Sequence, residues 1–433
     1  MKTLITNATV LTMNDDTVLH NACIAIQDDK ITFIGNNGAV DTVFKPDNVI
    51  NADKKLVMPG LVNAHTHVGM ALLRNYADDL FLEDWLFKKI FPAERKFEQI
   101  DVYWSAMLCI AEMIKTGTTC FGDMYFFEEQ IAKAVDETGI RANLSVGMTN
   151  NNTDFDVASD RDINAQTELY NNWHGKADGR IRVSAGPHSV YTTTLEYLKA
   201  CAELAKQLSI GIHIHILETD TEKQNSIRNF GVTSVEHCVN AGIFDVPVIA
   251  AHSIHLNSTD MDIYAQKNAS AVHCPGSNLK LGSGVAPIAE LVSKDINVCL
   301  GTDSVASNNN LDMFEEIRLA ATIHKGVHRD AQLVTAYDAL KMATVNGARA
   351  LAFYDDLGIL KVGMKADLII LDIDKINYYP HHDIISAIAY SANSSDVDTV
   401  IVNGRVLMEK RELTTVDEEK VKYNIKKLAM KLM

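Results

Sequence analysis

From Val57 onward, short apolar segments typical of strands alternate with longer amphipathic segments typical of helices. Eight strand-like segments occur, at residues 61–67, 118–124, 141–148, 180–188, 211–219, 246–256, 269–275 and 296–305. Intervening segments such as IDVYWSAMLCIAEMIKTG and LEYLKACAELAKQL repeat apolar residues every three or four positions, as amphipathic helices do. Eight such units predict a parallel sheet closed as a TIM-type (β/α)8 barrel over residues 57–360.

The two ends of the chain follow a different pattern. Residues 1–56 and 361–433 contain alternating strand-like segments, and Asn403-Gly404 is a dipeptide typical of two-residue hairpin turns. They predict one small β-sandwich domain built from both termini, followed by a Lys-rich amphipathic helix from about Asp417. The expected fold class is therefore α/β, with a barrel and an appended β-sandwich.

Charge and composition exclude several classes of partner. The formal net charge of -16 and the pI near 5.4 produce a field that repels phosphate backbones and anionic lipids, so neither nucleic acid nor a membrane is expected as a partner. No apolar run has the length of a membrane span, and the first residues alternate like a strand instead of a signal peptide. The seven cysteines are scattered singly, as reduced core thiols are. We expect a cytoplasmic protein, and homo-oligomer formation is left open.

Histidines and carboxylates gather at the ends of the predicted strands. His65 and His67 are two residues apart, so a strand turns both imidazoles to one side, which in a barrel is the interior. Functional residues of such barrels lie at the C-terminal ends of the strands. His215 on the fifth strand and Asp303 on the eighth complete a set of three imidazoles and one carboxylate, which suits one divalent ion such as Zn²⁺, with Fe or Mn as alternatives. We predict these four residues as metal ligands.

Simpler explanations exist for parts of this set. A His-x-His pair alone is a weak signal, and Asp303 lies among residues that favour turn or helix caps. His213 shares a face with His215 but lies farther from the strand end, so we expect it to be a hydrogen-bonded core histidine.

Two further residues are predicted to act in catalysis beside Asp303. Glu218 ends the fifth strand, where its carboxylate can carry protons between water and a leaving group, a contribution of roughly 10²- to 10⁴-fold in rate. Its alternative is a helix-start carboxylate, because the next residues are typical of a helix N-terminus. His252, on the sixth strand, can accept a proton from water or stabilise the attacking oxygen. Its alternative is an ordinary core histidine, and nearby His255 shows that histidines here need not be functional.

Several motifs together resemble the amidohydrolase superfamily. They are PGLVNAHTH, LLRNYADDLFLEDWLFKKIFPAE, HIHILET, AHSIHL, NLKLGSG, GTDSVASNNNLDMFEEIRLA, ATVNGARAL and GMKADLIILD, and they span nearly the whole chain. Within the superfamily the sequence is most similar to the 5'-methylthioadenosine/S-adenosylhomocysteine deaminases. The resemblance implies a mononuclear zinc centre on the four predicted ligands and hydrolysis of an adenine nucleoside to an inosine-type product and ammonia. It also implies proton transfer and substrate contact by Glu218, contact of Glu94 with the ribose hydroxyls, and contact of His188 with the nucleoside.

One position departs from these relatives. Val146 stands where they carry an arginine for the amino-acid carboxylate of S-adenosylhomocysteine, so we expect methylthioadenosine or adenosine to be preferred unless Arg141, Arg161 or another basic residue substitutes. One rival function is an aminohydrolase that acts on guanine, a pterin or a triazine; these substrates have no ribose for Glu94 to contact. A second rival is a two-metal hydrolase of cyclic amides. The latter needs a bridging lysine on the fourth strand, and residues 177–198 contain none. A non-catalytic relative would lack part of the ligand set.

Overall fold

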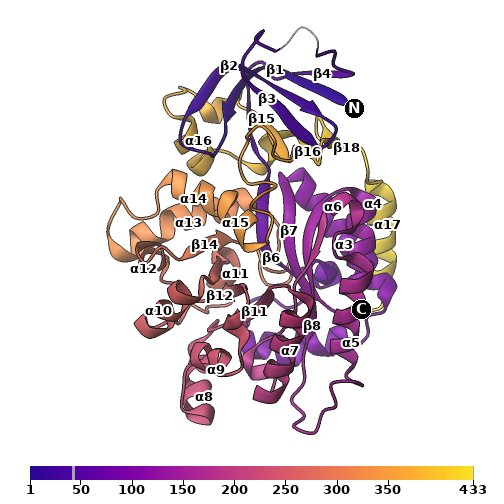
Figure 1. The fold of residues 1–433 in the computed structure, drawn as a ribbon, viewed down its shortest axis with the longest axis vertical. Coiled ribbons are helices and arrows are strands. Elements are labelled where there is room, and N and C mark those ends of the chain that lie inside the picture. The colour runs from indigo at the N-terminus through magenta and orange to yellow at the C-terminus, as the bar shows by residue number, and fades with distance from the viewer. Residues whose placement is uncertain (41–43, 433) are drawn as a thin grey trace.

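The middle of the chain alternates strands and helices as the sequence predicts. The structure is a computed structural model that describes residues 1–40 and 44–432 (Figure 1). The central strands are β6 (Leu61–Thr66), β7 (Thr118–Tyr125), β8 (Arg141–Met148), β9 (Ile181–Val183), β10 (Gly186–Pro187), β11 (Ile212–Ile216), β12 (Val248–His252), β13 (Ser270–His273) and β14 (Asn297–Leu300). The fourth predicted strand is therefore divided into β9 and β10.

Helices follow most of these strands. The longer ones are α3 (Gln99–Lys115), α4 (Glu128–Thr138), α5 (Arg161–Trp173), α7 (Leu195–Leu208), α8 (Asp220–Phe230), α10 (Ser258–Lys267), α13 (Met313–His328) and α17 (Glu418–Ala429). Shorter ones are α1 (Leu82–Trp85), α2 (Phe91–Glu94), α6 (Lys176–Gly179), α9 (Ser234–Asn240), α11 (Pro275–Lys280), α12 (Ile288–Ser293), α14 (Ala336–Met342), α15 (Val345–Ala350) and α16 (Ile384–Tyr390).

The central strands pair in parallel in two groups. One group has the order β10-β8-β7-β6, with β9 also on β8, and the other has the order β11-β12-β13-β14. Parallel bridges from Ala185 to Ile212 and from Ser189 to His215 connect the two groups on one side. On the other side the Asp303 amide donates to the His65 carbonyl at 3.0 Å. Closure of all these strands into one barrel stays a prediction.

Both termini contribute to one nine-stranded sheet. Its strands are β1 (Lys2–Leu11), β2 (Val18–Gln27), β3 (Lys30–Asn36), β4 (Asn48–Asn51), β5 (Lys55–Pro59), β15 (Leu368–Asp372), β16 (Val397–Val402), β17 (Arg405–Glu409) and β18 (Glu412–Leu413). The predicted turn joins β16 to β17, with φ of 51° at Asn403 and 74° at Gly404, the left-handed values of a type I′ hairpin. Hydrogen bonding joins all nine strands into one sheet, so the two-layer sandwich stays a prediction.

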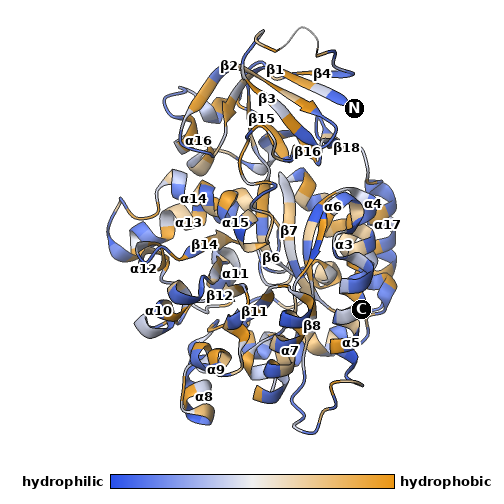
Figure 2. Ribbon diagram, viewed as in Figure 1, coloured by the Kyte–Doolittle hydropathy of each residue, from blue (hydrophilic) through white to orange (hydrophobic). Residues whose placement is uncertain are grey.

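Helix α7 illustrates how local sequence produces these elements. The Thr194 hydroxyl accepts from the Tyr197 amide and caps the first turn, and Ser209 ends the helix with a left-handed φ of 55°. Buried residues recur at one face of the helix, including Leu198 and Cys201, and pack in the core. Figure 2 shows the same division more widely, with apolar colour on strands such as β2 and mostly polar colour on the outer helix α17.

A buried ion pair joins the terminal sheet to the central strands. Arg141, the first residue of β8, donates to both carboxylate oxygens of Asp367 at 2.8 and 3.0 Å. The Gly60 amide, just before β6, also donates to the Asp367 carbonyl at 3.1 Å. The terminal sheet therefore lies against the N-terminal ends of these strands, and Figure 1 shows their C-terminal ends pointing away from it.

The remaining expectations concern the tail, the thiols and the membrane. The predicted C-terminal helix is α17, which the Asp417 carboxylate caps. All seven cysteines lie within the described residues and are buried, without disulfides. In the described part of the chain, no helix combines the length and apolar character needed to cross a bilayer.

Candidate metal centre and active site

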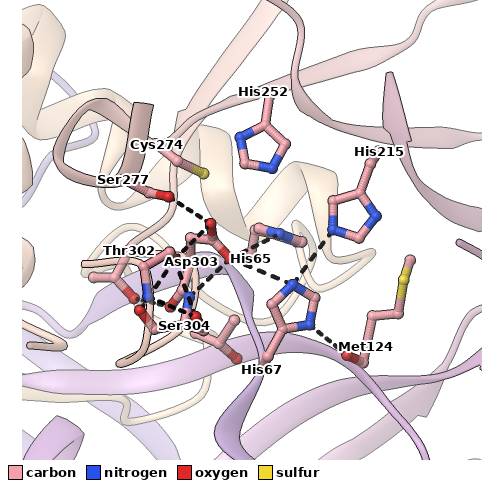
Figure 3. A network of polar contacts seen from close by, with 12 residues as sticks. His65, His67, Met124, His215, His252, Cys274, Ser277, Thr302, Asp303 and Ser304 are labelled. Carbon is pink, nitrogen blue, oxygen red and sulfur yellow. Dashed lines mark hydrogen bonds and ion pairs between the residues drawn. The ribbon is translucent and has the colours of Figure 1, made fainter. Parts of the chain in front are cut away.

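The four predicted ligands come together at the C-terminal ends of the central strands (Figure 3). His67 Nε2 lies 3.3 Å from Asp303 Oδ1, and His65 Nε2 lies 3.6 Å from the same oxygen. His215 Nε2 approaches His67 Nε2 at 3.3 Å. Strand β6 and the residue after it supply two of these groups, β11 supplies the third, and the segment after β14 supplies the carboxylate. Residues from three separate parts of the chain thus face one point.

Hydrogen bonds to the far side of each imidazole direct Nε2 toward that point. His67 Nδ1 lies 2.5 Å from the Met124 carbonyl, and His215 Nδ1 lies 2.7 Å from the His188 carbonyl. A carbonyl only accepts, so Nδ1 carries the proton in both rings and Nε2 keeps its lone pair when the ring is neutral. His65 Nδ1 lies 2.8 Å from His213 Nε2, and its buried Nε2 has no hydrogen-bond partner among the described residues. Three lone pairs and one carboxylate are the donor set that a zinc ion takes.

The Asp303 carboxylate is held by its own surroundings. Its Oδ2 accepts from the Ser277 hydroxyl at 2.6 Å and from the Ser307 hydroxyl at 2.9 Å, which leaves Oδ1 toward the histidines. The backbone of Asp303 has a φ of 61°, a strained value for a residue other than glycine. Its Oδ1 also accepts from the Ser304 amide at 2.8 Å. The side chain therefore combines the turn-capping contact considered above with a position facing two imidazoles.

The charges of the site favour a cation. Burial lowers the pKa of His65 to about 4, so this ring is neutral at pH 7. Burial alone would also lower the pKa of His67, but Asp303 outweighs it and raises this pKa to about 9. Burial would raise the pKa of Asp303, but the nearby imidazoles of His65 and His67 hold it well below its ordinary value. Without a metal, the positive charge of protonated His67 compensates the negative charge of the buried Asp303 carboxylate. A divalent ion can replace this proton as the countercharge.

Glu218 and His252 lie beside the ligands. Their side chains face each other, with His252 Nε2 3.8 Å from Glu218 Oε2. Burial raises the pKa of Glu218 to about 7, against the opposing effect of His252. Glu222, in the first turn of α8, accepts from the amides of Leu217 and Glu218 at 2.9 and 3.0 Å and fixes this backbone. Thr219 caps α8, so Glu218 precedes the helix, as the alternative supposes, while its carboxylate lines the site cavity.

A cavity of about 860 Å³ opens above the ligands. Asp303, Glu218 and His252 line its floor, and apolar residues from the segment of α1 and α2 line its wall: Leu82, Trp85, Leu86, Ile90 and Phe91. The volume and the apolar wall suit a ligand of drug-like size.

The two predicted substrate contacts line the same cavity. Glu94 accepts from the Tyr125 hydroxyl at 2.6 Å, and burial raises the pKa of its carboxyl group. His188 Nδ1 lies 3.1 Å from the Thr192 hydroxyl, and burial lowers the pKa of its ring to about 3, so the ring is neutral. Both side chains retain hydrogen-bonding capacity toward the cavity, because each of these contacts engages only one polar atom.

The basic residues near Val146 differ in their placement. Val146 is buried and lines the cavity. Arg141 does not line it, since its guanidinium is held by Asp367 at the opposite ends of the strands. Arg161 lines the cavity but is ion-paired to Asp162 at 2.8 Å. Arg141 is therefore unavailable as a substitute cation, whereas Arg161 is near the site.

Sequence reasoning missed several groups that shape the site. Tyr125 ends β7 and had no motif to mark it as the partner of Glu94. Ser277 and Asn278 lie within α11, just before and at the start of the recognised motif NLKLGSG, yet no role was assigned to either. Their position directly after strand β13 could have marked them as site residues, because the site of such a fold is built at the C-terminal ends of the strands.

Comparison with known proteins identifies the family of the chain. A family model described as "Amidohydrolase family" matches residues 56–407, which is most of the chain. The chain belongs to the amidohydrolase family. This amidohydrolase is 50% identical over 439 aligned residues to the 5-methylthioadenosine/S-adenosylhomocysteine deaminase of Thermoanaerobacter pseudethanolicus, and the alignment covers 100% of both chains. The predicted family is confirmed.

Solved structures show the same relationship. This amidohydrolase superposes on an adenosine deaminase from Xanthomonas campestris with bound zinc, with a TM-score of 0.92 and 34% identity over 98% of this chain and 97% of that one. The atrazine chlorohydrolase of Arthrobacter aurescens, complexed with zinc, has a TM-score of 0.90 and 24% identity over 99% of this chain and 100% of that one. The second likeness shows the fold alone. The predicted α/β fold class is confirmed as that of the amidohydrolases.

Proposed function

We propose that this amidohydrolase catalyses the hydrolytic deamination of an adenine nucleoside, 5'-methylthioadenosine or adenosine, to the inosine-type product and ammonia. The observation that carries the proposal is the convergence of His65, His67, His215 and Asp303 beside one cavity, which Glu218 and Glu94 also line. The full-length identity to a curated deaminase supports the same chemistry. Val146 brings no charge to the cavity and Arg141 is held by Asp367, which favours a substrate without a carboxylate over S-adenosylhomocysteine.

We assign His65, His67, His215 and Asp303 as the ligands of one divalent ion, Zn²⁺ in the first instance, with Fe and Mn as alternatives. The orphaned Nε2 of His65 and the directed lone pairs of the other two rings fit such an ion. When bound, zinc lowers the pKa of a coordinated water from 15.7 to about 7 and so supplies a nucleophile at neutral pH.

The side chains around the nucleophile carry the protons. The Glu218 carboxylate takes a proton from the attacking water and delivers it to N1 of the adenine ring while the oxygen bonds to C6. His252 Nε2 accepts the proton of the new hydroxyl group and passes it to the amino group, which leaves as ammonia. Asp303, beside both groups, stabilises the positive charge on His252 while it holds that proton. The product keeps the proton on N1 and a carbonyl at C6, so one water is consumed for each ammonia released.

The remaining contacts position the nucleoside. The Glu94 carboxylate can accept from both vicinal ribose hydroxyls, because the Tyr125 hydroxyl occupies only Oε1. His188 hydrogen-bonds the nucleoside, and the apolar wall from Leu82 to Phe91 takes the 5'-substituent and excludes water. A free base offers no diol and would leave the buried carboxylate without a partner.

The supporting architecture is proposed in the same way. Residues 57–360 form the closed (β/α)8 barrel, and residues 1–56 with 361–433 form the β-sandwich domain. The hydrogen bond from the Asp303 amide to the His65 carbonyl and the bridges to Ile212 and His215 support closure. The small-molecule nucleoside is the only partner that the proposal requires.

A substrate screen tests the proposal. The ultraviolet spectrum is followed for adenosine, methylthioadenosine, S-adenosylhomocysteine, guanine and free adenine, with metal content measured on the same sample. The expected result is deamination of methylthioadenosine and adenosine by protein that holds about one zinc per chain. Turnover of guanine alone, or of no compound by zinc-loaded protein, would contradict the proposed function.

A further inference from the structure

Helix α11 places two neighbouring side chains against the candidate site, and Figure 3 shows the first of them, Ser277, beside Asp303. The Ser277 hydroxyl donates to Asp303 Oδ2 at 2.6 Å, and the next residue, Asn278, lies with Oδ1 2.9 Å from His252 Nδ1. Both side chains are almost completely buried, with residue exposures of 0% and 1%. One turn of the chain therefore contacts both the carboxylate ligand and the imidazole beside Glu218.

A buried carboxylate behind the site fixes this turn. Glu316, on α13, accepts from the Gly276 amide at 3.0 Å and from the Asn308 side-chain amide at 2.7 Å. A Cβ atom at Gly276 would lie 2.5 Å from Glu316 Oε1, so the absence of a side chain there permits the close approach. Asn308 also donates to the Thr302 carbonyl at 2.8 Å, which ties α11 to the segment that carries Asp303.

We infer that Asn278 is a positioning residue that sets the tautomer of His252. A carbonyl oxygen only accepts, so its contact with Nδ1 requires the proton of the neutral ring to lie on Nδ1. Nε2 then keeps its lone pair, and Nε2 is the atom that faces Glu218 at 3.8 Å. With the proton on Nε2, the ring could not accept a proton from the reacting hydroxyl. Asn278 thus leaves Nε2 of His252 free to accept the proton.

The opposite orientation of the Asn278 amide has the opposite consequence. The amide nitrogen of Asn278 has no hydrogen-bond partner among the described residues. The two orientations of the amide therefore differ mainly in whether its oxygen or its nitrogen faces His252 Nδ1. An N–H against Nδ1 would force the proton of the neutral ring onto Nε2. Measurement of the His252 tautomer therefore decides between the two orientations of the Asn278 amide.

Nitrogen NMR of the zinc-loaded protein tests the inference without turnover. Protein labelled with ¹⁵N-histidine is compared with its His252→Gln variant, which identifies the His252 signals. At a pH at which the His252 ring is neutral, the expected spectrum shows a protonated Nδ1 and an unprotonated Nε2. A protonated Nε2 with an unprotonated Nδ1 would overturn the inference.

Kinetics provide the second test, which rests on the proposed deaminase function. Asn278→Leu keeps the approximate volume but removes the acceptor, and kcat is expected to fall by about 10- to 100-fold while KM stays within about twofold and zinc content is unchanged. Asn278→Asp keeps an acceptor oxygen and is expected to restore the tautomer and most of the lost kcat. Asn297→Leu is the matched control, because Asn297 is a buried amide that contacts Ser270 and Asn346 instead of the site.

The outcomes are separable. Asn278→Leu with kcat within about twofold of the unmodified protein, or Asn278→Asp no better than Asn278→Leu, would overturn the inference. A fall in kcat for Asn297→Leu equal to that of Asn278→Leu would assign the effect to general destabilisation and overturn it as well. Zinc-loaded protein that deaminates no nucleoside would refute the proposed function instead, and the tautomer measurement would still decide the role of Asn278.

Discussion

His67 Nε2 lies 3.3 Å from Asp303 Oδ1, although one residue follows the first central strand and the other follows the last. The contact is possible because the Asp303 amide also donates to the His65 carbonyl, which aligns the two segments. The carboxylate reaches the histidines from a left-handed backbone conformation, with φ of 61° at Asp303. The fold thus holds a buried anion against two imidazoles, an arrangement that a divalent cation stabilises.

Replacement of a metal ligand should remove the zinc. Replacement of a residue that hydrogen-bonds a ligand should only weaken zinc binding. His215→Ala is expected to lose zinc, because it removes one of the four donors that the proposed site needs. His213→Phe removes the partner of His65 Nδ1 and is expected to lower zinc affinity by about 10- to 100-fold. Zinc competition against a chelator measures both. His255→Ala is the control, since His255 contacts the Ser283 carbonyl, and His215→Ala with stoichiometric zinc would refute the ligand assignment.

Glu218→Gln should separate metal binding from turnover. The amide cannot accept a proton from water, so kcat is expected to fall by about 10²- to 10⁴-fold with zinc content unchanged. Rapid turnover by this variant would remove Glu218 from the proton-transfer role.

The same variant should change how the stability of the metal-free protein depends on pH. The raised pKa of Glu218 means that the folded state holds its proton more tightly than the unfolded state does. Stability from this group is therefore complete below about pH 4.5 and is lost as the pH rises to about 7. The shift from 4.5 to about 7, at 1.36 kcal/mol per pH unit, gives a loss of up to about 3 kcal/mol, which Glu218→Gln avoids. Chemical denaturation should show a more stable variant at about pH 8 and equal stabilities near pH 4; the reverse order would contradict the sign.

Glu94→Gln should weaken nucleoside binding selectively. The neutral amide loses the charge-assisted bonds to the ribose diol, and kcat/KM for adenosine is expected to fall by about tenfold or more. Tyr125→Phe removes the hydrogen bond to Glu94 and should have a smaller effect in the same direction. Steady-state kinetics with adenosine and 2'-deoxyadenosine provide the check. An unchanged preference between the two substrates would show that Glu94 does not contact the ribose.

Asp367→Asn should lower stability without affecting chemistry. It leaves the fully buried Arg141 guanidinium without a countercharge, and breaking such a pair costs about 3–5 kcal/mol. Denaturant unfolding of the zinc-loaded variant measures the loss. Because this pair lies at the N-terminal ends of the strands, zinc content and kcat are expected to stay unchanged. An effect on kcat with normal stability would contradict this separation.

The parts of the fold and site that depend on local pattern were predictable from the sequence. Alternating strands and helices and the Asn403-Gly404 turn follow from periodicity and turn chemistry, and both are present. The spacing of His65 and His67 puts them on one side, and both approach Asp303. His213 was expected as a hydrogen-bonded core histidine, and the structure adds that its partner is a predicted ligand.

The parts that depend on approach between distant segments were not predictable. The interruption between β9 and β10 does not alter the hydrophobic pattern, so residues 180–188 read as one strand. Tyr125 meets Glu94 only because α2 folds over the end of β7, and Asn278 meets His252 only because α11 follows β13 closely. No fixed spacing in the sequence relates the two partners of either hydrogen bond, because they belong to two separate βα units.

A crystal structure of the protein as purified, with an anomalous difference map at the zinc absorption edge, tests the central claim most directly. The account predicts one peak per chain, within bonding distance of the Nε2 atoms of His65, His67 and His215 and of Asp303 Oδ1. A peak bound by other residues, or a map without a peak in protein that deaminates nucleosides, would contradict it.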